Sequence, residues 1–443
     1  MASLNSASQP CTLASLPLEL LAQILSLLPS LVDLKAAVQA TSIFHQAYLS
    51  DRKRILYVIL HATLGNRVFV DAYAVQTTLH FQHLDYLARH DAVEHFVTFI
   101  HQRYPVLPTN TILQLPECSV EGLAGISSFF SSTIRPLLQN VFQMFLQKIP
   151  LGVEIDPIST LETRQIMRAL YRFELWCSLH GAGSGTSPDY PLLLHAGPVN
   201  LLMNLFEVYE PWELEEIACI YTLLHKMYKG IFDDVRERFE EEDKALEEAN
   251  KADAHERYFF PVRRSLHVAT HQSTFPEPTY WQTLGIPRED WRNGALSKGL
   301  RWHLRVMRAS DVFAKLRMIL SEVAFLADET SLARALSWEA QTHRRQVQPS
   351  SRDGLEPPDL VRISDRLRVT ELRQLLLLFG DGAEDKQPLG WVVVFRGKYC
   401  NWYGGVLPWE LKCWGWVFWD SQRLEKTGML EKLAGPWTGE PPW

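Results

Sequence analysis

The sequence predicts a mainly α-helical protein with a small Trp-rich β element near its C-terminal end. Apolar side chains recur every three or four residues in one segment after another, most densely at 120–149 and at Thr160–His180, which Gly181 ends. This spacing places them on one face of a helix. Near the C-terminal end the pattern changes to β-branched and aromatic residues, in Trp391–Phe395 and Cys413–Trp419. Such residues are typical of strands, so we expect helical bundles and at most a small sheet.

Composition and charge narrow the class of protein. The chain has 443 residues, 47% hydrophobic and 21% charged, which is typical of a globular protein of two to four domains. The net charge of −7 gives no basic surface for nucleic acid. No apolar run approaches the roughly 18–20 residues of a membrane span. No basic residue precedes residue 16, which argues against a signal peptide. The six cysteines form no CxxC pair, and we expect a soluble protein of the cytoplasm, the nucleus or both.

The most distinctive part of the chain is the apolar helix expected at 16–29. Pro17 suits the first turn of a helix, where its missing N–H leaves no hydrogen bond unmade. The polar residues between the two flanking prolines are Glu19, Gln23 and Ser26, which form one narrow stripe. A surface helix usually has an apolar stripe of roughly 100° or somewhat more, whereas this helix is apolar around most of its circumference. It must therefore be covered from more than one side.

Two further short helices are expected directly after it. Ser30 and Asp33 have the spacing of a capping box, which opens a helix through Leu34. A third helix carries Phe44 and Tyr48 on one face. Three helices in about fifty residues make too small a core to be self-sufficient. The uncovered side of the first helix must meet either the rest of the chain or a partner protein.

This N-terminal region resembles a known family. Its short motifs lie within Ser15–Tyr48: Leu16-Pro17, Glu19-Leu20-Leu21, Ile24-Leu25, Leu28, the Ser30–Leu34 turn and Thr41-Ser42-Ile43-Phe44. Together they resemble an F-box, and more narrowly the F-box proteins of filamentous fungi. The Trp414–Glu425 segment is similar to the tails of many of those proteins. In that family the F-box binds the Skp adaptor of cullin–RING ubiquitin ligases, and the rest of the chain recruits a substrate.

The resemblance implies a substrate-receptor subunit of an SCF-type ligase that catalyses nothing itself and needs no cofactor. Its partners would be the Skp adaptor, a cullin held through it, and a protein substrate. Two other functional classes are an F-box scaffold or regulator that acts outside ubiquitylation and an enzyme whose site is hidden in the helical body. An ordinary helical hairpin of a larger bundle is the alternative to the F-box itself. The residues that would hold the adaptor are Leu16, Pro17, Leu20, Ile24, Leu25, Leu28, Leu34 and Phe44.

Changes in composition divide the chain into successive regions. We expect a disordered lead-in at 1–14, the F-box at 15–50, a helical region at 51–180, a linker at 181–190, a second helical region at 191–345, a linker at 346–358, and a C-terminal helix with the Trp-rich segment at 359–443.

The candidate motifs for metal binding or catalysis each lack a residue or a context that the chemistry requires. The Gly-rich stretch 181–187 follows a helix rather than a strand, and no Lys stands before its Ser or Thr, so a phosphate loop is not expected. His267 and His271 have the spacing of a zinc protease, but Val268 stands where the general base would be. The histidines at 80–101 have no cysteine near them. The sequence thus predicts no metal, cofactor or catalytic residue.

Two segments leave alternatives open. Residues 233–257 carry eleven acids and five bases, which is typical of a solvated helix face but would also suit a basic partner. Eight of the fourteen tryptophans lie at or after Trp391. Large aromatics are frequent both in cores and at the centres of interfaces; we favour the core.

Overall fold

The computed structural model describes residues 13, 16–79, 81, 86–103, 118–147, 156–180, 206, 209–252, 288–322, 387–395 and 409–433. Of the part that it describes, 84% is helical and none is in a strand, which confirms the mainly α prediction. The expected lead-in apart from Leu13, both linkers, and the C-terminal region before residue 387 lie outside these residues.

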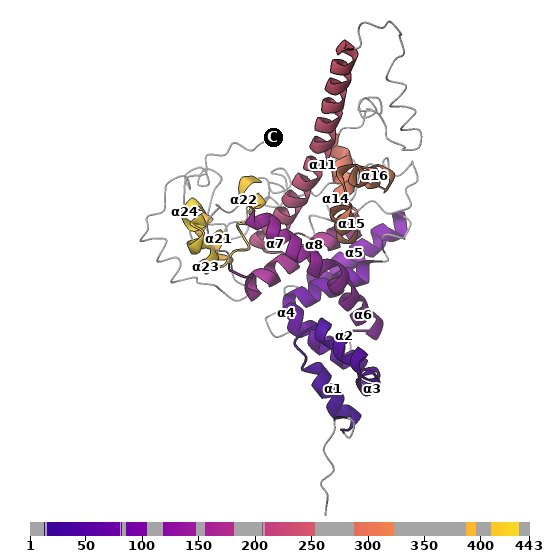
Figure 1. Cartoon of the computed structure of the whole chain (residues 1–443). Helices are drawn as coiled ribbons and strands as arrows, with labels where there is room; N and C mark the ends of the chain where they lie inside the picture. The colour runs from indigo at the N-terminus through magenta and orange to yellow at the C-terminus, as the bar shows by residue number, and fades with distance from the viewer. Residues whose placement is uncertain are drawn as a thin grey trace, which may run out of the picture.

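Three short helices form the N-terminal module at one end of the molecule: α1 (Leu18–Ser26), α2 (Leu31–Ala40) and α3 (Ser42–Ser50) (Figure 1). Pro17 stands just before α1 rather than inside it. The Ser30 hydroxyl accepts the Asp33 N–H at 3.2 Å and caps α2, as the sequence predicts. The Thr41 hydroxyl accepts the Phe44 N–H at 3.2 Å and caps α3 in the same way. Side-chain caps thus mark the residues at which α2 and α3 begin.

The middle of the chain forms the body around α8. Within the helix predicted at 120–149, a π-helical turn at Phe130–Ile134 lies between two α-helical parts, Val120–Phe129 and Arg135–Leu146. This turn ends two residues before Pro136, which lacks an N–H and disfavours a regular α-helical ladder there. The helices of this part are α4 (Arg52–Thr78), α5 (Tyr86–Arg103), α6 (Val120–Phe129), α7 (Arg135–Leu146) and α8 (Thr160–His180), and α4 packs against α6 and α8.

One long helix, α11 (Pro211–Ala252), packs against α8 with its first half and extends past the body with its second (Figure 1). The charged segment that begins at 233 is thus the continuation of a buried helix. Three shorter helices are described at 288–322: α14 (Arg288–Leu296), α15 (Leu300–Arg308) and α16 (Val312–Glu322). Gly299, with φ 86°, separates the first two of these.

The Trp-rich segment packs onto the body as short helices and turns, and the expected strand at Trp391–Phe395 is wrong. Residues Leu389–Val394 form helix α21 instead. Trp391 is fully buried there, with ring centroids 6.2 Å from Trp212 and 6.1 Å from Trp416. Strand propensity mainly reflects how well a side chain fits a packed surface, and here the bulky rings fill a space between helices. The other helices of this segment are α22 (Trp409–Cys413), α23 (Ser421–Lys426) and α24 (Met429–Leu433) (Figure 1).

Among the described residues, α4 is long and apolar enough to cross a membrane by length and composition. Half of that stretch is buried inside the protein, and Asp71 within it forms a buried ion pair. A single helix of this kind is weak support for a span, since the core helix of a globular protein passes the same test.

Candidate functional site

A row of exposed aliphatic side chains runs along α1. Leu20 is 44% exposed, Ile24 38% and Leu27 82%. Because they stand at i, i+4 and i+7, they lie on one stripe of the helix. Soluble proteins seldom leave several large aliphatic side chains side by side in water unless the surface meets a partner.

The opposite side of α1 explains why this row stays uncovered. Leu21, Ala22 and Leu25 are buried, and α1 packs against α3 and α4. Helices α3 and α4 cover one side of an almost entirely apolar helix, and the remaining side faces outward. The sequence predicts a partly exposed row of Leu20, Ile24 and Leu28; the structure leaves Leu20 and Ile24 exposed, whereas Leu28 is half-buried.

The structure divides the eight residues expected at the adaptor into three groups. Pro17, Leu20 and Ile24 are exposed. Leu16, Leu28 and Phe44 are half-buried and pack against the core. Leu25 and Leu34 are buried, so their side chains hold the module together rather than form its surface.

Sequence reasoning missed several exposed aliphatic residues of the module. Leu27 is more exposed than Leu20 or Ile24, and Leu18, Val32 and Leu49 are exposed as well. The spacing of Leu27 from Ile24 and Leu20 could have indicated it, because position i+7 continues an i, i+4 stripe better than the neighbouring Leu28 does.

The body is held together by a second feature, a buried ion cluster centred on Glu213 in the first turn of α11. Its carboxylate lies 2.9 Å from Arg67 Nη1, 3.3 Å from Arg168 Nη1 and 3.1 Å from Arg172 Nη1. It also accepts the Glu210 N–H at 3.0 Å. Burial alone would raise the pKa of Glu213, but the charges of Arg172, Arg168 and Arg67 outweigh it and lower that pKa to about 2.

The positive charges of this cluster have further partners. Arg168 makes a bidentate contact with Glu216, at 2.9 Å from Nε and 2.5 Å from Nη2. Arg172 Nε donates to Asp71 at 3.0 Å. Three arginines thus face three carboxylates across α4, α8 and α11, which is the condition for burying such groups without a large penalty. The pairing leaves the cluster neutral and points to a role in joining the three helices.

A buried group of Tyr228, His303 and Cys177 contains residue types that are used in nucleophilic catalysis. The protonation states of the histidine and the cysteine argue against that use. Tyr228 Oη lies 2.5 Å from His303 Nδ1, and His303 Nε2 lies 3.1 Å from the Leu296 carbonyl. Cys177 Sγ donates to the same carbonyl at 3.4 Å. Burial raises the pKa of Cys177 well above its ordinary value, and burial lowers the pKa of His303 to about 3. A protonated thiol beside a neutral imidazole is the reverse of an activated pair.

Among the described residues no three His, Cys, Asp or Glu side chains converge in a way that could hold a metal ion. The exposed row on α1 is therefore the feature that best suits a functional surface.

Comparison of the chain with protein-family models, with curated proteins and with solved structures finds no match.

Proposed function

We propose that the chain is an F-box protein that binds a Skp-type adaptor through α1 and acts, in the cytoplasm or nucleus, as a substrate receptor of an SCF-type ubiquitin ligase. The observation that carries the proposal is the exposed row of Leu20, Ile24 and Leu27. It lies on the helix whose motifs resemble the adaptor-binding helix of an F-box. The motif residues Leu20 and Ile24 are thus also the ones that the structure leaves exposed.

The energetics suit an apolar interface. Each aliphatic side chain of the row that a partner covers fully would contribute about 1.5–3 kcal/mol of hydrophobic stabilisation. Part of this is offset by the freedom lost on association. The expected contribution of the chain to the reaction is proximity: α1 holds the adaptor while the body holds a substrate near the ubiquitin-conjugating enzyme.

The test is a charge introduced into the row. Ile24→Asp places an unpaired carboxylate in the contact and should abolish co-purification with the Skp adaptor. Since Ile24 is already 38% exposed, the melting temperature of the whole protein should change little.

A matched control lies one residue away. Gln23 is exposed on the polar stripe, so Gln23→Asp adds the same charge outside the row and should keep the adaptor bound. Adaptor binding by Ile24→Asp equal to that of Gln23→Asp would contradict the proposal. Binding of the adaptor without recruitment of a cullin would instead favour a scaffold that acts outside ubiquitylation.

A further inference from the structure

Helix α4 bends at one residue, Gly65. Its backbone angles are φ 75° and ψ 171°, which are not helical, in the middle of the 27-residue segment Arg52–Thr78. This combination of angles is available essentially to glycine alone, because a Cβ atom would clash with the backbone. The chain therefore changes direction at Gly65, and residues 52–64 and 66–78 form two helical halves.

Aromatic rings on the two halves pack against each other across the bend. The Phe69 ring lies edge-on to Tyr57, with centroids 5.6 Å apart, and 6.0 Å from the His61 ring. In a straight helix, twelve residues would separate Tyr57 from Phe69 by about 18 Å along the axis. His61 and Asn66 also share a hydrogen bond across Gly65. These contacts brace the bend in one geometry.

The second half of α4 is fixed firmly in the body. Arg67 and Asp71 join the ion cluster, through Glu213 at 2.9 Å and Arg172 at 3.0 Å. The first half follows directly from the N-terminal module, and both α1 and α3 pack against α4. Figure 1 shows the module at the end of the molecule where α4 begins. The bend thus lies on the path between the module and the ion cluster.

We propose that the Gly65 bend is a braced joint that sets the direction in which the α1 apolar row is held relative to the body. Gly65 supplies the change of direction, the rings of Tyr57, His61 and Phe69 keep it closed, and the ion cluster anchors its far side. The joint is a property of the free chain, and it holds whatever the exposed row binds.

The test measures a distance across the joint in the full chain. Spin labels at Lys35→Cys on α2 and Gln139→Cys on α7 occupy exposed positions on either side. Cys11 and Cys400 are replaced by Ser so that the spin label does not react with them. The other four native cysteines are buried and can stay. We expect one narrow distance distribution for the labelled parent. Gly65→Ala should shift its mean by at least about one helical turn, roughly 5 Å, or give a second population.

Three further variants decide the result. Gly230→Ala is the control for glycine replacement, because Gly230 lies inside α11 with open space around it, and it should leave the distribution unchanged. The brace is removed, with Gly65 kept, in Tyr57→Leu and Phe69→Leu. Each of these variants should broaden the distance distribution. They decide the result if the Gly65→Ala protein does not fold. A folded Gly65→Ala protein with the parent distribution, or brace variants that leave it unchanged, would overturn the proposal.

Discussion

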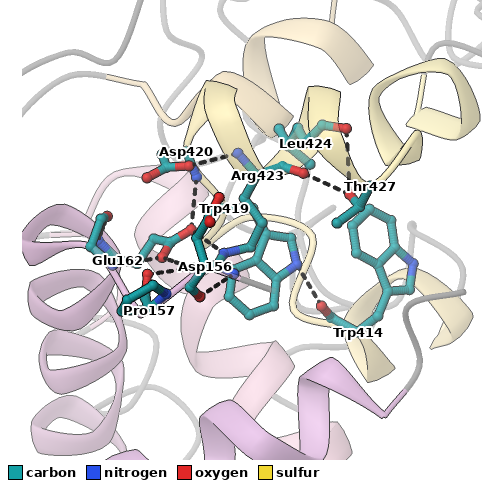
Figure 2. Close-up of polar contacts among 10 residues, drawn as sticks. Asp156, Pro157, Glu162, Trp414, Trp419, Asp420, Arg423, Leu424 and Thr427 are labelled. Carbon is teal, nitrogen blue, oxygen red and sulfur yellow. Dashed lines mark hydrogen bonds and ion pairs between the residues drawn. The ribbon is translucent and has the colours of Figure 1, made fainter. Parts of the chain in front are cut away.

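Arg423 and Glu162 lie 261 residues apart in the sequence and form a buried bidentate ion pair. Arg423 Nε lies 2.7 Å from one oxygen of Glu162 and Nη2 lies 2.8 Å from the other. Glu162 also accepts the Ser159 N–H at 2.9 Å, so the same carboxylate caps α8. Figure 2 shows Arg423 pointing from the Trp-rich segment toward Glu162, Asp156 and Pro157. One pair thus fastens the C-terminal segment to the beginning of α8.

Removal of one partner of this pair should destabilise the protein strongly. Arg423→Met leaves the Glu162 carboxylate buried without its cation, and we expect a loss of about 3–5 kcal/mol in the free energy of unfolding. Equilibrium denaturation in urea measures it.

The exposed pair beside it provides the control. Lys426 Nζ lies 2.8 Å from Asp156, and both side chains are 38% exposed. Lys426→Met should therefore cost less than about 1 kcal/mol. Equal losses for the two variants would contradict the assignment of Arg423 as the fastening residue.

The tryptophans of the C-terminal segment should be needed for folding. Trp414, Trp416 and Trp419 are buried, and the Trp419 Nε1–H donates to the Trp414 carbonyl at 2.8 Å. Truncation after Phe379 removes these rings and uncovers their partners Phe142 and Phe145. We expect an insoluble protein or one that melts without cooperativity, as judged by gel filtration and calorimetry. A soluble truncated chain with a cooperative transition would mean that the rings belong to an interface instead.

Two nearby leucines of the N-terminal module should respond differently to substitution by alanine. Leu25 is fully buried, so Leu25→Ala should cost about 2–5 kcal/mol by loss of packing and creation of a cavity. Leu27 is 82% exposed, so Leu27→Ala should change stability by no more than about 0.5 kcal/mol. Hydrogen exchange of the α1 amides measures the module directly. Comparable losses in the two variants would show that Leu27 is packed in solution.

Local chemistry explains which helices the sequence could predict. The bounds of α8 agree with the prediction, since periodic apolar residues and Gly181 mark it within one segment, and the Ser30 cap of α2 is equally local. The failure at Trp391 has a different origin. Its helix is stabilised by Trp212 and Trp416, and no local pattern indicates those contacts.

The candidate site likewise has features that a local pattern predicts and features that depend on distant helices. The sequence predicts a partly exposed row of Leu20, Ile24 and Leu28, of which Leu20 and Ile24 are exposed in the structure and Leu28 is half-buried. Which side of α1 the body covers depends on α3 and α4, so the burial of Leu25 and the exposure of Leu27 could not be deduced from the helix alone. The ion cluster was missed for the same reason, because Asp71, Arg172 and Glu213 come from three distant helices.

The buried carboxylate of Glu174 should make stability depend on pH. It accepts the Leu300 N–H at 2.5 Å. Burial raises its pKa from 4.5 to about 7, although the Leu300 hydrogen bond and the charge of Arg301 oppose this. The folded state therefore binds a proton that the unfolded state releases between these two values. The resulting stabilisation is fully present below pH 4.5 and is lost as pH rises through about 7.

Glu174→Gln removes this titration while keeping an oxygen that can accept the Leu300 N–H. The difference in unfolding free energy between the parent and Glu174→Gln should fall as pH rises from 5 to 8, by up to about 3 kcal/mol. Groups common to both proteins cancel in this difference. Glu425→Gln removes one exposed carboxylate and controls for the loss of a negative charge. If the Glu174→Gln curve is parallel to the parent, Glu174 is ionised throughout this range and its burial in solution is incomplete.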